Sequence, residues 1–165
     1  MQKRLPILIL SFMCTFLLTG CIVEADDDPE IDFGSVEFVF SMSDAVINGD
    51  VASSQFNVPA INRAVVDNGA VLAYVREQGT WTAMPFTFGV ESPDLPAVDF
   101  TITMGFGFDE GFLEVFYEAS SEAANLEEQP DRFIKVVILD DLSIPAVANL
   151  DLSNYEQVKQ TLQLD

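Results

Sequence analysis

The chain has 165 residues with 27 acidic and seven basic side chains, which give a formal net charge of −20 at pH 7. A surface this acidic repels the phosphates of nucleic acids, so nucleic-acid binding is excluded. The chain has no histidine, which excludes acid, base and metal-ligand chemistry based on imidazole.

Residues 1–20 have the pattern of a bacterial export signal. Lys3 and Arg4 precede an apolar stretch, residues 5–18, that is shorter than the roughly 20 helical residues needed to span a bilayer. A motif that resembles the lipobox of bacterial lipoproteins follows: Leu18, Thr19, Gly20 and Cys21. The resemblance implies cleavage before Cys21, which then carries a covalent diacylglyceryl group and an N-acyl chain. An uncleaved anchor and a soluble secreted protein with a chance cysteine remain alternatives.

Cleavage would discard Cys14 and leave residues 21–165 without a free thiol. We expect the lipid on Cys21 to anchor the protein on a membrane, because two or three acyl chains bind stably. No other cofactor is expected. The stretch CIVEADDDPEID, residues 21–32, has six carboxylates and is predicted to be an extended acidic tether. Its consecutive aspartates lack the alternating spacing and the glycine of a calcium loop, so no metal site is predicted.

The domain predicted at residues 33–165 begins with strand-like alternation. Val36, Phe38, Phe40 and Met42 occupy alternate positions and are expected to share one sheet face. The stretch around Pro59 is ambiguous. We interpret it as a strand, then a loop or a helical turn, then a strand that starts near Ala70.

Two hairpins and a central strand follow. Gly79 supplies a turn between two apolar runs, and Asp109-Glu110-Gly111 supplies a second between VDFTITMGFGF and FLEVFYEA. Residues 132–139, RFIKVVIL, form an apolar run typical of a central strand. Its two basic residues, Arg132 and Lys135, are expected to form surface ion pairs.

The chain closes with a predicted helix at about residues 154–164. Ser153 and Glu156 have capping-box spacing, and Tyr155, Val158 and Leu162 fall on one helical face, which we expect to dock on the sheet edge. The whole pattern predicts an all-β fold, an antiparallel β-sandwich of six to seven strands with a short C-terminal helix. A small β-barrel is the alternative.

Three segments carry a wider resemblance: NGAVLAYVREQGTWTAMPFTF, GFLEVFYEA, and RFIKVVILDD with the later LDLSNYEQVKQTL. Together with the leader they resemble a group of Bacteroidota-type lipoproteins that combine a lipobox, an acidic tether and one small β domain. The tether itself resembles the export signal of surface lipoproteins in that phylum. The resemblance implies an outer-membrane location facing the medium and assigns no activity.

The chain contains no nucleophile elbow, P-loop or dinucleotide fingerprint, and we predict that it is not an enzyme. A carboxylate-only glycosidase remains an alternative, because that chemistry needs only two acids. Asp109 and Glu110 at a hairpin tip, and Asp140 and Asp141 after a strand, are interpreted as solvated turn residues.

The stretch MGFGFDEGF is the most suggestive for binding. Gly105 and Gly107 alternate with phenylalanines and could leave one sheet face bare for a ligand. Core packing of these rings is the preferred interpretation. The candidate ligand contacts are Trp81, Phe106, Phe108 and Phe112.

From these features we predict a lipid-anchored envelope protein with a binding or structural role. Its partner would be an extracellular glycan or peptide, because a flat aromatic ring beside carboxylates suits either ligand. A periplasm-facing assembly subunit, which would dock an envelope protein through an unpaired sheet edge, is the alternative.

Overall fold

The computed structural model describes residues 34–92, 95–141 and 147–164. The predicted signal at residues 1–20, its lipobox, the lipidated Cys21 and the tether at residues 21–32 lie outside the described residues. They therefore stay predictions from the sequence. The described strands and helices belong to one compact unit, Ile31–Asp165.

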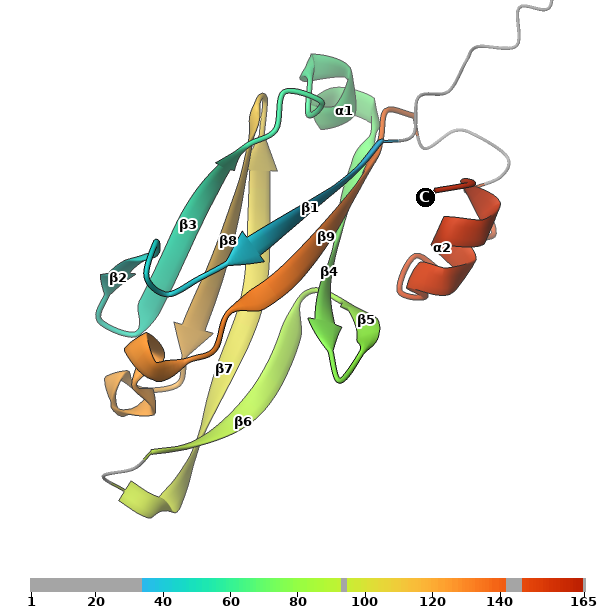
Figure 1. The fold of residues 1–165 in the computed structure, drawn as a ribbon. Helices are drawn as coiled ribbons and strands as arrows, with labels where there is room; N and C mark the ends of the chain where they lie inside the picture. Colours follow the sequence, from blue (N-terminus) through green and yellow to red (C-terminus); the bar gives the residue numbers. More distant parts are fainter. Residues whose placement is uncertain (1–33, 93–94, 142–146, 165) are drawn as a thin grey trace, which may run out of the picture. The chain divides into compact units, whose positions relative to one another are not determined.

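Nine strands form two antiparallel sheets that lie face to face (Figure 1). The front sheet has the order β1–β9–β4–β5, with the bounds Gly34–Phe40, Arg132–Leu139, Ala70–Glu77 and Thr80–Ala83. The back sheet has the order β2–β3–β8–β7–β6, with the bounds Val46–Asn48, Val51–Asn57, Phe112–Ala119, Leu95–Asp109 and Phe86–Ser92. The predicted antiparallel β-sandwich is confirmed, and the described strands do not close into the small barrel that was its alternative.

The core lies between the sheets because alternate residues of each strand point inward. In β1, Val36, Phe38 and Phe40 pack into this core, which confirms the alternation predicted there. Phe40 meets Tyr117 of β8 edge to face, with ring centroids 5.0 Å apart. This contact joins the front sheet to the back sheet.

Both predicted hairpins are present. The β4–β5 loop consists of Gln78 at φ 48° and Gly79 at φ 88°, and positive φ at both central residues defines the tight turn that matches strand twist. Gly111, at φ 84°, turns β7 into β8. In each case the glycine adopts a conformation that costs other residues energy.

The described residues form nine strands where the periodicity suggests six or seven. One addition is the three-residue strand β2, which is too short for a visible pattern. The other arises because the run after Gly79 divides at Pro85. Met84 still donates its N–H to Ala73 of the front sheet, but proline has no N–H to continue the ladder. The chain then enters the back sheet as β6.

Strand β9 is central, as predicted, with β1 on one side and β4 on the other. Val136 lies opposite Val36 of β1 and Ala73 of β4. Its residues 134–139 are all buried. Both of its faces are therefore covered, one by the back sheet and the other by the C-terminal segment.

The described part of the chain also contains two α-helices. Helix α1, Arg63–Asn68, is the helical turn that the ambiguous stretch after Pro59 allowed. Helix α2, Tyr155–Thr161, confirms the predicted C-terminal helix, and Figure 1 shows it beside β4 and β5. Two short 3₁₀ helices, Glu122–Ala124 and Leu126–Glu128, connect β8 to β9.

Two details of α2 differ from the sequence prediction. The cap is Asn154, whose side chain accepts a hydrogen bond from the Gln157 N–H, whereas Ser153 bonds to Asp151. The helix also packs over the outer face of the front sheet and not along an edge. The reason is that β4 and β9 place apolar side chains, including Tyr74 and Val137, on that face.

Candidate functional site

The C-terminal segment and the front sheet together build the strongest candidate site. Tyr74 of β4 is fully buried, and its hydroxyl donates a 2.7 Å hydrogen bond to the Leu152 carbonyl oxygen. Its ring meets Tyr155 of α2 at a centroid distance of 5.1 Å, and Tyr155 lies 5.8 Å from Trp81 of β5. The hydrogen bond thus holds the segment before α2 against the sheet, and the ring contacts hold the start of α2 there.

Lys135 of β9 lies among these rings. Its Nζ is 5.1 Å from the Trp81 ring centroid and 5.2 Å from that of Tyr155, within the range of cation–π attraction. The ammonium group also bonds to the Glu37 carboxylate at 2.6 Å. Burial by itself lowers the pKa of Lys135, but the Glu37 carboxylate and the neighbouring Tyr155 hydroxyl outweigh that effect and raise it. Lys135 is therefore charged at neutral pH.

A cavity of about 430 Å³ opens beside Trp81, and we name it the Trp81 cavity. One wall is the tip of the β4–β5 hairpin, and the other is the segment that leads into α2. Its lining residues are Gly79, Thr80, Trp81, Asp151, Ser153, Asn154, Tyr155 and Glu156. This volume lies within the range of small-ligand sites, which combine apolar surface with a few converging polar groups.

Hydrogen bonds between neighbouring residues hold the polar side chains of the α2 wall in place. Asp151 accepts hydrogen bonds from the Ser153 hydroxyl at 2.6 Å and from its N–H at 3.0 Å, and these two bonds lower the pKa of Asp151. The N-cap bond of Asn154 holds the first turn of α2 in place. The wall therefore presents an ionised carboxylate, hydroxyl groups and the Glu156 side chain to a ligand.

Of the candidate contacts named from the sequence, Trp81 lines this cavity. The other three do not line it. Phe106 packs against the core, whereas Phe108 and Phe112 are 38% and 39% exposed near the hairpin tip. The alternation of strand residues places Phe108 and Phe112 on opposite faces of the back sheet.

Gly105 does not leave a bare sheet face. A Cβ built on Gly105 would come within 2.4 Å of the Phe116 ring, so that ring already covers the position. Gly107 is different, because no atom lies within 4 Å of a Cβ built there. The sheet face is therefore covered at Gly105 and open at Gly107.

Sequence reasoning missed Tyr155 and Lys135 as parts of the site. Lys135 was expected on the surface, yet it is 8% exposed, because its Nζ lies against the Trp81 and Tyr155 rings. Its position inside an apolar strand was the available signal. Arg132, also paired as predicted, points between the sheets, where it bonds Glu77 at 2.5 Å and lies 5.1 Å from the Phe88 ring centroid.

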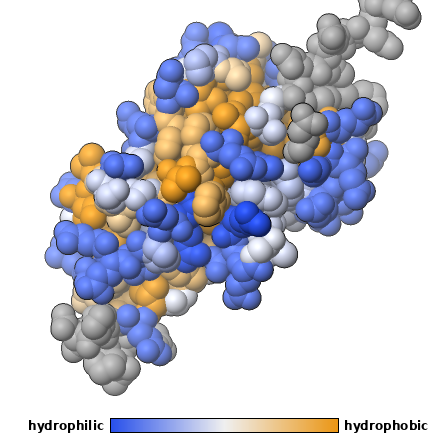
Figure 2. Space-filling model, in the orientation of Figure 1, coloured by the Kyte–Doolittle hydropathy of each residue, from blue (hydrophilic) through white to orange (hydrophobic). Residues whose placement is uncertain are grey.

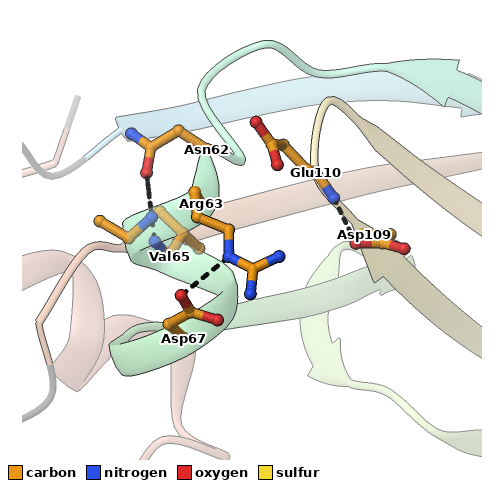
Figure 3. A network of polar contacts seen from close by, with 7 residues as sticks. Asn62, Arg63, Val65, Asp67, Asp109 and Glu110 are labelled. Atoms are coloured by element: carbon orange, nitrogen blue, oxygen red, sulfur yellow. Dashed lines mark hydrogen bonds and ion pairs between the residues drawn. The ribbon is translucent and has the colours of Figure 1, made fainter.

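A second cluster of polar side chains lies at the start of α1 (Figure 3). Asn62 caps the helix by accepting hydrogen bonds from the N–H groups of Ala64 and Val65, and Arg63 pairs with Asp67 at 2.8 Å. At the nearby hairpin tip, Asp109 accepts a bond from the Glu110 N–H. These are capping and turn contacts between exposed groups, which supports the interpretation of Asp109 and Glu110 as turn residues.

Comparison with protein-family models, curated proteins and solved structures finds no match. Within the described residues, no three or more histidine, cysteine or acidic side chains gather in a way that could hold a metal ion. The described helices are also each too short or too polar to cross a membrane.

Proposed function

We propose that this chain is a lipid-anchored protein of the cell envelope that binds an extracellular glycan or peptide at the Trp81 cavity. The observation that carries the proposal is the cavity itself, where a partly buried indole faces hydroxyl, amide and carboxylate groups. A flat ring beside polar groups supplies contact area at little entropic cost, which suits recognition of a ligand.

The arrangement of acids supports binding more than hydrolysis. A glycosidase needs two carboxyl groups on opposite sides of the scissile bond. Asp151 and Glu156 both belong to the α2 wall of the cavity, and the described residues of the hairpin wall are Gly79, Thr80 and Trp81. A substrate in the cavity would therefore meet carboxylates from one side only.

The location in the proposal rests on the leader sequence. The lipobox that ends in Cys21 favours attachment to the outer membrane, and the acidic tether favours exposure to the medium. We propose the domain at residues 33–165 as the part that reaches the ligand, with the tether at residues 21–32 as its spacer.

Protease shaving of intact cells tests this location. The cells would carry a C-terminally tagged chain or its Cys21→Ala variant. We expect the tag to be lost from intact cells and the variant to be released or left unprocessed. Protection of the tag until the envelope is broken would instead place the domain in the periplasm.

Binding is tested on the purified full-length chain with a panel of glycans and peptides. Calorimetry on the unaltered chain and on a Trp81→Ala variant would locate the site, with Phe112→Ala as a control for loss of an exposed ring on the back sheet, outside the cavity. Unfolding curves of both variants would show that each is folded. Loss of binding in the control but not in Trp81→Ala would contradict the proposed site.

A second candidate function is assembly with another envelope protein. Val39 of β1 and Phe133 of β9 are cross-strand partners, and they are 48% and 52% exposed. Figure 2 shows apolar surface over these strands. Among the described strands, β9 is the one neighbour of β1 in the front sheet, so the other edge of β1 could receive an extended strand of a partner.

In-cell photocrosslinking tests this second candidate. A crosslinking residue at Val39 is expected to capture a defined partner band, whereas the same residue at Val46, which is 73% exposed on the back sheet, is not. Equal capture at both positions, or at neither, would count against a docking surface at β1.

A further inference from the structure

We infer that the ligand of the Trp81 cavity is a neutral, polyhydroxylated molecule, a glycan without net charge. This inference rests on the proposed function and narrows its ligand class. The charges near the indole are two cations at the ring and two carboxylates on the opposite cavity wall.

The indole already interacts with two cations of the protein. Lys135 Nζ lies 5.1 Å from the Trp81 ring centroid, and Arg76 Cζ lies 6.0 Å from it. Arg76 is the cross-strand partner of Trp81, so the antiparallel register keeps it in place. A cationic ligand would have to compete with these two cations for the electron-rich indole.

The opposite wall disfavours an anionic ligand. Asp151 and Glu156 are exposed carboxylates that line the cavity, and Ser153 keeps Asp151 ionised by two hydrogen bonds. The formal net charge of −20 for the whole chain adds a long-range repulsion of anions. An anionic ligand therefore meets like charge in the cavity, and a cationic ligand must compete with Lys135 and Arg76 for the indole.

A neutral sugar fits both walls. Its hydroxyl groups can donate to the carboxylates of Asp151 and Glu156. They can also donate to the hydroxyl oxygens of Thr80 and Ser153, whose own protons are given to the Glu77 carbonyl oxygen and to Asp151. Its C–H face can stack on the indole of Trp81. Hydrogen bonds from neutral donors to ionised acceptors are strong, so two carboxylates supply specificity without needing a charged partner.

The experiment uses the fact that Trp81 is the single tryptophan of the chain, so its fluorescence reports on this cavity alone. Full-length protein in detergent would be titrated with three kinds of probe: neutral oligosaccharides of glucose, xylose and mannose, an oligogalacturonate, and an oligolysine peptide. We expect a neutral oligosaccharide to shift the emission in a saturable way that is nearly independent of salt, because screening weakens only charged contacts.

A matched pair of variants sharpens the test. Glu156→Gln removes one charge from the cavity wall and is expected to weaken neutral-glycan binding by roughly tenfold, the equivalent of one charge-assisted hydrogen bond. Glu128→Gln makes the same change at an exposed site outside the cavity and is expected to leave affinity unchanged. Similar weakening by both would overturn the assignment.

The possible failures are distinguishable. If only oligolysine or only oligogalacturonate shifts the Trp81 emission, the neutral-glycan inference is overturned while binding at the cavity stands. If no probe of any class perturbs Trp81, but calorimetry on the same sample detects binding, the ligand lies elsewhere and both the inference and the proposed site fall. If neither method detects binding of any probe, the inference falls and the assembly function gains support.

Discussion

The hydroxyl of Tyr74 donates a 2.7 Å hydrogen bond to the carbonyl oxygen of Leu152, 78 residues further along the chain. This bond joins a strand of the front sheet to the segment that forms one wall of the Trp81 cavity. The geometry of the candidate site therefore depends on a contact between parts of the chain that are distant in sequence.

Replacing Tyr74 by phenylalanine should lower the free energy of unfolding by about 1 kcal/mol, because the Leu152 carbonyl loses its partner while the ring remains. Tyr74→Ala should cost about 3–5 kcal/mol, because it also removes a fully buried ring. Urea unfolding curves give both values. Equal losses in the two variants would show that the ring contributes nothing beyond the bond.

Stability should also depend on pH through Tyr74. Burial, with smaller contributions from Tyr155 and Asp151, raises the pKa of Tyr74 from 10.0 to about 12. The unfolded chain therefore releases the Tyr74 proton at a lower pH than the folded chain does. The stabilisation is fully present below pH 10 and is lost towards pH 12, on the order of 1–3 kcal/mol for this group.

Urea unfolding at pH 9 and pH 11 measures this effect. The unaltered chain should lose more stability between the two conditions than Tyr74→Phe, which has no proton to release at that position. A pH dependence identical in the two proteins would contradict the assignment to Tyr74.

Gly105→Ala should destabilise the back sheet by roughly 1 kcal/mol, because its Cβ would lie within 2.4 Å of the Phe116 ring and would force it away. Gly107→Ala is the matched control. No atom lies within 4 Å of its new Cβ, so it should be neutral or slightly stabilising. A double-mutant cycle with Phe116→Ala measures the coupling, which should be close to zero for Gly107 and clearly non-zero for Gly105.

Lys135→Glu should destabilise the protein by about 3 kcal/mol or more. The change places a second carboxylate beside Glu37 in a buried position and removes the cation from the Trp81 and Tyr155 rings. Lys159→Glu, in the last turn of α2, makes the same change of charge at a less buried site and should cost less than about 1 kcal/mol. Thermal unfolding of both variants would show whether Lys135→Glu lowers stability more than the same change of charge does at Lys159.

The fold could be predicted from local signals that the structure confirms. Gly79 and Gly111 marked the hairpins, and the alternation of Val36, Phe38 and Phe40 marked an inward face. The division of one predicted strand at Pro85 was harder to see, because the residues on both sides have strand character. Only the assignment of β5 and β6 to different sheets makes that division visible.

The candidate site was less predictable. Trp81 was named from its aromatic character alone, but the wall that faces it comes from residues 151–156, which no local pattern connects to the β4–β5 hairpin. The interpretation of Lys135 as a surface residue followed from its charge. Its burial depends on two rings that lie on β5 and α2.

Properties that depend on neighbouring residues follow from the sequence alone: the strand alternation, the turns at glycine and the helix at the C-terminus. These follow from backbone sterics and from the burial of one face of each element. Three features come from the packing of the sheets and α2: α2 covers a sheet face, Phe116 covers Gly105, and the Trp81 cavity exists. The physical reason is that each of these features is a contact between distant segments, and such contacts are set by how the sheets and helix pack together.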